Sequence, residues 1–263
     1  MQERHTDRKR YFDEQALTTQ KYVIPFISEV SPITAESTVL EIGCGEGGNM
    51  VPFLDMGCTV VGIDLNQQQL ENAAVYFQDH PNKDNLELIC QDIYKVSPEE
   101  VGRFDVIVMR DVIEHIPNQE KFMGYVKNFL KDDGLFFLGF PPWQMPFGGH
   151  QQTFKGFLGK TPWIHLLPGP LYPALMKAGG GTKEVIDYKM FIKETGISIE
   201  RFKKIIKDER YIVHREVMYF INPNYETKFN LTPRVQSSII SKIPYFRNFA
   251  TTCCYYVLSK PKA

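Results

Sequence analysis

The sequence lacks a long apolar run, an excess of charge of either sign and a paired cysteine motif. No stretch approaches about 18 uninterrupted apolar residues, which argues against a transmembrane helix. Lys and Arg number 30 against 31 Asp and Glu, so the formal net charge of −1 does not favour a nucleic acid partner. The opening MQERHTDRKR is basic, but no apolar segment follows it. We therefore expect no secretory signal and a cytoplasmic location.

Cysteine is infrequent and shows no pairing pattern. The five cysteines are odd in number, have no C-x-x-C spacing and lie mostly in apolar, strand-like runs: Cys44, Cys58, Cys90, Cys253 and Cys254. That pattern predicts buried free thiols rather than disulfides or metal ligands. A length of 263 residues with 43% hydrophobic and 23% charged residues is typical of one folded domain with an embellishment.

Short apolar runs alternate with helix-length segments through the first half of the chain. The predicted strands are 38–43, 58–64, 86–90, 104–109 and 135–140. The predicted helices are 49–57, 66–80 and 118–134. Asn66 is a plausible N-cap, Ala74 is expected on a buried face, and Gly134 is expected to end its helix. The pattern predicts a mostly parallel sheet that helices cover on both faces.

The alternation stops at Pro141. A Pro-, Gly- and aromatic-rich insertion, residues 143–187, follows the fifth strand. We therefore divide the single domain 1–263 into an N-terminal helical cap (1–37), a core (38–142), the insertion (143–187) and a C-terminal part that completes the sheet (188–263). The last part contains a predicted helix in ISIERFKKIIKD, strands at 210–221 and 251–260, and a possible helix at 233–242. Long insertions after a sheet strand are often functional lids, and a packing element or oligomer contact is the alternative.

The stretch VLEIGCGEGGNM, residues 39–50, runs from a strand into a glycine-rich turn that opens a helix. Such a turn brings a ligand against bare backbone and aims helix N-terminal amides at it, so it predicts a nucleotide-cofactor site. Taken alone the turn is ambiguous. Gly43, Gly45 and Gly48 also fit the dinucleotide pattern G-x-G-x-x-G, with Asp64 as the ribose-binding acid.

Three further features favour a cationic cofactor over a dinucleotide. Glu41 precedes the first glycine, at the end of the first strand, where a pyrophosphate would gain nothing from an acid. Asp92 follows the third strand, in a place that suits an adenine amino group. The fourth strand ends FDVIVMRDVIEHIP and is followed by LKDDGLFFLGFP.

This ordered set resembles the class I S-adenosylmethionine-dependent methyltransferase family over about 39–142. The motifs are E-x-G-x-G-x-G, an acid ending the second strand, D-I after the third, and D-V-I-V…E-H-I before G-L-F-F-L. The E-H segment is similar to that of ubiquinone-pathway O-methyltransferases. The resemblance implies an α/β, Rossmann-like, doubly wound sheet of seven mostly parallel strands with an antiparallel last strand. The cofactor would be S-adenosylmethionine, with S-adenosylhomocysteine as product.

The resemblance also implies roles for individual residues. Nine residues would contact the cofactor: Glu41, Gly43, Cys44, Gly45, Asp64, Leu65, Asp92, Ile93 and Arg110. Glu41 would hold the methionine portion, Asp64 the ribose and Asp92 the adenine amino group. Leu65 and Ile93 would pack beside the adenine, and Arg110 would make contact mainly through its backbone.

Methyl transfer from a sulfonium needs positioning more than acid-base groups, and a base matters only when the acceptor loses a proton. His115 is the best candidate base, although a role in shaping the pocket is equally open. We assign no metal. The alternative is a divalent cation at Asp111, Glu114 and His115, in a D-x-x-E-H cluster similar to metal-binding methyltransferases, with His150 as a further ligand.

The acceptor site is expected beside the loop PPWQMPFGGHQ, with Trp143, Phe147 and His150 as wall residues unless the first two only anchor the insertion. Tyr11 and Phe12 of the N-terminal cap are expected near the cofactor. The expected partner is a small molecule methylated on an oxygen: a metabolite, quinone, lipid or sugar. A membrane contact through WIHLLPGPLYPALMK is a less favoured option. A dinucleotide-dependent oxidoreductase and a non-catalytic binding protein are the competing functions.

Overall fold

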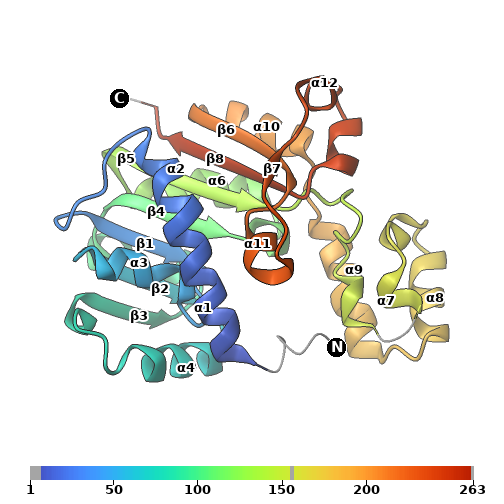
Figure 1. Ribbon diagram of the computed structural model, residues 1–263, viewed down its shortest axis with the longest axis horizontal. Coiled ribbons are helices and arrows are strands. Elements are labelled where there is room, and N and C mark those ends of the chain that lie inside the picture. The colour runs from blue at the N-terminus through green and yellow to red at the C-terminus, as the bar shows by residue number, and fades with distance from the viewer. Residues whose placement is uncertain (1–6, 155–156, 262–263) are drawn as a thin grey trace.

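The computed structural model describes residues 7–154 and 157–261. Its centre is one eight-stranded sheet in the order β3-β2-β1-β4-β5-β8-β6-β7 (Figure 1). The strands are β1 Thr38–Ile42, β2 Thr59–Asp64, β3 Leu86–Cys90, β4 Phe104–Arg110, β5 Leu130–Phe140, β6 Ile212–Ile221, β7 Arg234–Val235 and β8 Cys253–Ser259. The first five strands pair in parallel, and β8 lies between β5 and β6, antiparallel to both.

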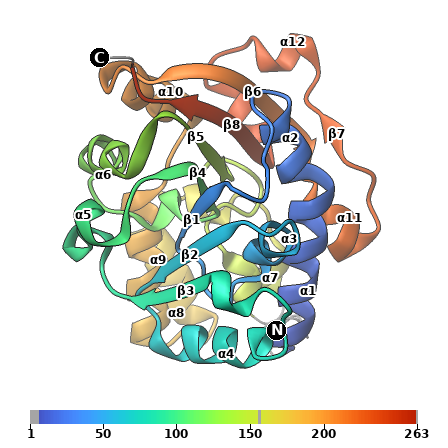
Figure 2. The same cartoon turned by 90° about the vertical axis from the view of Figure 1, so that its left-hand side faces the viewer.

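Helices cover both faces of the sheet (Figure 2). One face packs against α1 Arg8–Thr18, α2 Ile24–Ser28, α3 Val51–Asp55 and α4 Gln67–Phe77. The other face packs against α6 Gln119–Val126 and α10 Ile199–Asp208. The remaining helices are α5 Pro98–Val101, α7 Phe157–Lys160, α8 Leu171–Ala178, α9 Lys183–Thr195, α11 Asn224–Phe229 and α12 Ser238–Ser241. In the part of the chain that the structure describes, no helix is long and apolar enough to cross a membrane.

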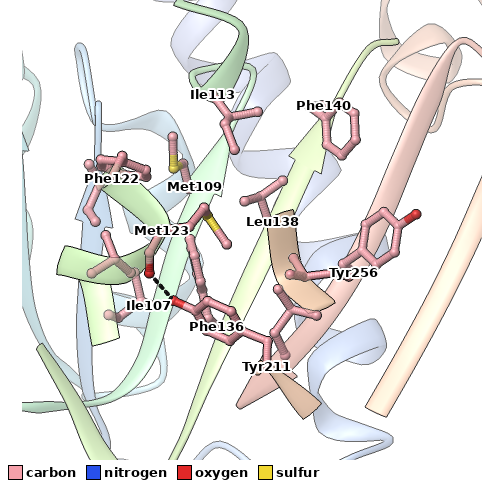
Figure 3. Close-up of a cluster of buried hydrophobic side chains, with 14 of the residues drawn as sticks. Ile107, Met109, Ile113, Phe122, Met123, Phe136, Leu138, Phe140, Tyr211 and Tyr256 are labelled. Atoms are coloured by element: carbon pink, nitrogen blue, oxygen red, sulfur yellow. Dashed lines mark hydrogen bonds between the residues drawn. The ribbon is translucent and has the colours of Figure 1, made fainter. Parts of the chain in front are cut away.

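The two faces have separate apolar cores because side chains alternate along each strand. On β1, Val39 belongs to the core under α1 to α4, whereas Leu40 and Ile42 belong to the core under α6 and α10. Figure 3 shows the second core. There the Tyr211 hydroxyl donates to the Met123 carbonyl at 2.8 Å, which ties the start of β6 to α6.

The five parallel strands, the insertion after the fifth and the antiparallel end of the sheet confirm the predicted architecture. Asn66 caps α4 as predicted, its side chain accepting from the Gln69 amide. The sheet has eight strands rather than seven because the two-residue β7 adds to the edge of β6.

The predicted helix 118–134 was too long. The α-helix ends at Val126, a 3-10 turn follows, and β5 already begins at Leu130. Gly134 therefore lies in a strand and does not end a helix. A Cβ on Gly134 would stand 2.7 Å from the Phe104 carbonyl oxygen, so this glycine permits a close approach of β4 and β5.

Several smaller expectations were also wrong. Cys90 is exposed because β3 is the edge strand of the sheet, and Ala74 is exposed on α4. The predicted helix at 233–242 is reduced to α12, preceded by β7. Helix α11 was not predicted. Phe12 packs in the core against Tyr76 and Phe77 and does not line the cofactor side.

The insertion has regular structure of its own. It contains α7, α8 and the start of α9, which crosses the predicted boundary after residue 187. Ile164, Tyr172 and Met176 form a small separate core between these helices. The membrane contact considered for WIHLLPGPLYPALMK depended on its apolar side chains. Two of them, Tyr172 and Met176, are buried inside the insertion.

Candidate active site

A cavity of about 1100 Å³ opens at the carboxyl ends of β1, β2 and β4. Its wall combines the turn after β1, the N-terminal helix α1, the loop and α7 of the insertion, and α11 with the loop after it. This is the edge of the sheet where ligands bind in open α/β folds. The cavity is therefore the candidate active site.

The turn after β1 is built by glycines in the left-handed region. Gly43 has φ 71° and Gly45 has φ 55°, and both line the cavity with Cys44. A Cβ on Gly43 would lie 2.6 Å from Val112 Cγ2, so a side chain there would collide with the loop after β4. The Gly45 amide donates to Asp64 Oδ2 at 2.8 Å, which holds the turn against the end of β2.

Asp64 lines the cavity at the end of β2, as predicted. Its second oxygen, Oδ1, accepts from the Asn66 amide at 2.8 Å. Both carboxylate oxygens are thus fixed by backbone amides, which orients the group toward the cavity before any ligand arrives.

A chain of buried polar groups connects Glu41 with Arg110. Asn49 Nδ2 donates to Glu41 Oε1 at 2.7 Å, and Arg110 Nη1 donates to Asn49 Oδ1 at 2.8 Å. Thr19, from the π-helical turn after α1, donates to the same Asn49 oxygen at 2.8 Å. The other Glu41 oxygen, Oε2, has no hydrogen-bond partner among the described residues, and burial raises the pKa of Glu41 to about 8. Glu41 is buried and is not among the described residues that line the cavity, whereas Arg110 is. A cationic ligand group that reached Glu41 Oε2 would satisfy this oxygen.

The Arg110 side chain lines the cavity and is almost fully buried. The sequence predicted a contact mainly through its backbone, but the structure places its guanidinium in the polar chain to Glu41.

Tyr11 also lines the cavity, as predicted, and burial raises its pKa to about 12. Glu46 was not predicted. It lines the cavity and accepts from Arg8 Nε at 2.7 Å, which joins the glycine turn to α1.

Three residues expected at the adenine do not belong to the described wall of the cavity. Leu65 is exposed. Asp92 accepts from the Tyr94 amide at 3.0 Å and caps a 3-10 turn, while Ile93 is buried in the core. These residues follow β2 and β3. The lining of the cavity in this direction ends at Asp64 and Gln69.

Two imidazoles and a carboxylate gather beside the loop after β4. The ligand atoms of Glu114, His115 and His150 all lie within 4.8 Å of one another, and the two imidazole centroids are 5.3 Å apart. Burial lowers the pKa of His150 to about 3 and also lowers that of His115. Neutral imidazoles can accept a proton or bind a metal ion. Glu114 and His150 line the cavity, and His115 lies behind them, its ring stacked on Tyr188.

The Glu114 carboxyl lies 3.9 Å, from Oε1 to His115 Nε2, from an imidazole that does not bond to it. Both carboxyl oxygens are buried without a hydrogen-bond partner among the described residues, and burial raises the pKa of this carboxyl well above its usual value. A divalent cation would supply the missing partner, and two imidazoles with a carboxylate suit a transition metal. Asp111, the first residue of the expected D-x-x-E-H set, is not in this trio. Asp111 has φ 55°, and its amide donates to the Gly139 carbonyl at 2.8 Å, so the backbone makes a tight turn there.

On the acceptor side Phe147 and His150 line the cavity, as predicted. Trp143 does not. Its ring packs edge-on against His165 at 4.6 Å, and its carbonyl oxygen lies 2.7 Å from His165 Nε2, so it anchors the insertion. The opposite wall comes from α11 and the following loop: Asn224, Tyr225, Lys228, Phe229 and Leu231. A six-residue helix shows too little periodicity for sequence reasoning to find it.

A family model described as "Methyltransferase domain" matches residues 14–151. Over 102 residues the chain is 33% identical to the ubiquinone biosynthesis O-methyltransferase of Glaesserella parasuis serovar 5 (strain SH0165), covering 38% of this chain and 43% of that protein. Over 99 residues it is 31% identical to the enzyme of the same name from Rhodopseudomonas palustris (strain HaA2), covering 37% of each. The matched region thus spans about two fifths of these curated relatives.

Solved structures show the same fold. The putative sarcosine dimethylglycine methyltransferase from Galdieria sulphuraria has a TM-score of 0.60 at 12% identity. The match covers 94% of this chain and 86% of that chain. The geranyl diphosphate C-methyltransferase from Streptomyces coelicolor A3(2), in complex with Mg²⁺, geranyl diphosphate and S-adenosyl-L-homocysteine, has a TM-score of 0.56 at 14% identity, covering 90% and 78%.

The trio of Glu114, His115 and His150 generates a prediction about metal binding. We expect Co²⁺ added to the purified protein to give a visible absorption band, because two imidazoles and a carboxylate fix its ligand field. Glu114→Gln and His150→Ala should abolish the band, and Asp111→Asn should keep it. Loss of the band in Asp111→Asn as well would show that Asp111 is also a ligand, as in the alternative D-x-x-E-H set, and retention of the band in Glu114→Gln and His150→Ala would contradict the trio.

Proposed function

The chain belongs to the methyltransferase family, and from that premise we propose that it transfers a methyl group from S-adenosylmethionine to an oxygen of a small-molecule acceptor. The observation that carries the proposal is the juxtaposition of the Glu41 carboxyl and the Arg110 guanidinium, buried behind the glycine turn and bridged by Asn49. The two become opposite charges when a bound ammonium ionises Glu41. An amino acid portion carries both an ammonium and a carboxylate, and this pair matches them. A pyrophosphate would meet an acid at Glu41, which disfavours a dinucleotide.

The remaining cofactor contacts follow from the strand ends. Gly43, Cys44 and Gly45 let the ligand approach the backbone, and the oriented Asp64 carboxylate accepts from the ribose hydroxyls. We propose that the adenine extends past Asp64 toward Leu65, Asp92 and Ile93, outside the described wall of the cavity. The Asp92 oxygen that does not bond to the Tyr94 amide is then available to the adenine amino group.

The reaction is an in-line displacement at the sulfonium methyl group, so holding the two reactants in line and excluding water supply most of the rate enhancement. Tyr11 and Phe147, on opposite sides of the cavity, exclude water from the reacting centre. The acceptor oxygen lies beside His150, and its proton passes by way of the His150 imidazole to His115, which lies behind that residue, as the methyl group arrives. A divalent cation bound by Glu114, His115 and His150 would instead polarise the acceptor oxygen, in which case His115 could not act as the base.

The acceptor half of the cavity suits a small, partly apolar molecule. Phe147, Phe154, Phe229 and Leu231 supply apolar wall, and Lys160 supplies positive charge. The insertion covers this half as a lid. The curated relatives are O-methyltransferases by name, which supports an oxygen acceptor over nitrogen or carbon. The cytoplasmic location expected from the sequence stays a prediction.

Arg110→Met tests the proposed contact with the methionine carboxylate. We expect it to weaken S-adenosylhomocysteine binding about 10- to 100-fold, because truncating one member of a buried charge pair costs roughly 2 kcal/mol or more. Binding of 5′-methylthioadenosine, which lacks the amino acid portion, should change less than threefold. Calorimetry with both ligands measures the difference. Equal loss for both would mean that Arg110 only supports the fold of the site.

The raised pKa of Glu41 predicts proton release on cofactor binding. With a pKa of about 8 the ligand-free carboxyl holds a proton at pH 7, and a bound ammonium favours the ionised form. Binding should therefore release close to one proton at pH 7 and strengthen as the pH rises toward 8, above which Glu41 is already ionised. Calorimetry in phosphate and in Tris measures the release. Glu41→Gln is the control, and equal release by this variant would contradict the assignment.

His115→Ala tests the base. We expect the rate of transfer of a labelled methyl group to fall about 10²- to 10⁴-fold, with S-adenosylhomocysteine affinity unchanged. The measurement uses acceptors found in a panel of phenols, quinols, hydroxylated lipids and sugars, with enzyme pretreated with EDTA. His214→Ala, on β6 away from the cavity, should retain full activity. A His115→Ala rate within threefold of the wild type would leave this histidine a role in shaping the pocket only.

A further inference from the structure

Exposed apolar side chains are concentrated in one segment near the C-terminus. Nine of the large apolar side chains exposed in the described chain lie between residues 220 and 249, here named the C-terminal ridge: Phe220, Phe229, Leu231, Val235, Ile239, Ile243, Tyr245, Phe246 and Phe249. They come from the end of β6, from α11, the loop after it, β7 and α12, and from the loop and 3-10 turn between α12 and β8. Figure 2 shows α11, β7 and α12 along one side of the molecule. Exposed apolar surface of this kind marks an interaction site.

Beyond Glu226, which is paired with Lys21, the segment that carries the ridge has charge of one sign. The sequence has 31 acidic residues, but none between Thr227 and the C-terminus. The ridge meanwhile carries Lys228, Arg234, Lys242 and Arg247. Arg247 is neutralised by Glu200, with Nε 2.9 Å from Oε1. The outer part of the ridge is therefore apolar and positive.

The ridge continues into the wall of the cavity. Lys228, Phe229 and Leu231 belong to both, and Phe229 and Leu231 remain about half exposed. Across the cavity, α7 supplies Lys160 to the wall and the exposed Phe157 beside it. Apolar and basic side chains thus stand on both sides of the acceptor half of the cavity.

We propose that the C-terminal ridge docks on the surface of an anionic phospholipid bilayer. Apolar side chains enter the boundary between headgroups and acyl chains, while lysine and arginine contact the lipid phosphates. A second copy of the chain fits less well, because a two-fold interface would place this positively charged surface against the same positively charged surface of its partner. The docking orients the cavity toward the bilayer.

With the cavity turned toward the bilayer, the acceptor could come from the membrane. This conclusion about the acceptor rests on the proposed function. An acceptor with an apolar tail would pass from the bilayer between Phe229 and Phe157 without crossing water. The reacting oxygen would then reach His150 while the tail remains among apolar side chains. Docking itself requires no cofactor, so it is measured separately from methyl transfer.

The test is co-sedimentation of the full chain with vesicles of equimolar phosphatidylglycerol and phosphatidylcholine, and with vesicles of phosphatidylcholine alone. We expect binding to the anionic vesicles only, and weakening by salt. Val235→Ser should weaken it roughly three- to tenfold, since it removes apolar surface that enters the bilayer. Val75→Ser, on α4, is the matched control because the two valines are 63% and 59% exposed. Arg234→Gln and Lys242→Gln should each lower binding about fivefold.

Three outcomes would overturn the proposal. One is failure of the wild type to sediment with anionic vesicles, and another is an equal effect of Val235→Ser and Val75→Ser. The third is a wild-type dimer in light scattering that Val235→Ser dissociates without any vesicle binding, which would make the ridge a self-association surface. Calorimetry with S-adenosylhomocysteine on the same preparation separates failure of docking from failure of the proposed function.

Discussion

The parallel pairing of β1 with β2 and β4 determines where every group of the cofactor half of the site lies. In the β1–β2 register Ile42 faces Ile63, and in the β1–β4 register Glu41 faces Val108. The residues that follow each strand therefore arrive at one edge. That edge receives the glycine turn, the Asp64 carboxylate and the Arg110 guanidinium without any of them being close in sequence.

The same edge concentrates buried charge. An isolated buried charge is costly. The Arg110 guanidinium is made tolerable by hydrogen bonds to Asn49 and Thr19, and burial raises the pKa of Glu41 to about 8, so that its carboxyl holds a proton until a cation binds. Asn49 lies between the two groups, and Glu41 Oε2 has no hydrogen-bond partner among the described residues. A zwitterionic ligand would complete this arrangement. Thr19 follows α1, so the N-terminal cap is part of the site.

Local patterns predicted the parts of the fold that depend on local physics. Apolar strand runs, the Asn66 cap and the glycine turn after β1 each carry their signal within a few residues. Gly134 was misread because a glycine after a helix-like segment is a common helix end, whereas here its role comes from contact with β4, far away in sequence. Trp143 was misplaced for the same reason, since its contacts are to His165 within the insertion.

The missing half of the acceptor site was beyond sequence reasoning. Helix α11 is short, and its place over the cavity depends on its packing against α1. By contrast, the sequence already indicated His150 as a further ligand beside His115, and the two imidazoles lie together because the insertion folds back onto the loop after β4. The exposed apolar side chains of the C-terminal ridge became visible only when the structure showed which of them the sheet does not bury.

Calorimetry with S-adenosylhomocysteine and NAD⁺, on the wild type and on Asp64→Ala, measures directly whether these strand ends form an S-adenosylmethionine site. We expect S-adenosylhomocysteine to bind the wild type and NAD⁺ not to bind it, and we expect Asp64→Ala to weaken S-adenosylhomocysteine binding at least about tenfold, or 1.4 kcal/mol. Binding of NAD⁺ without S-adenosylhomocysteine would contradict this expectation.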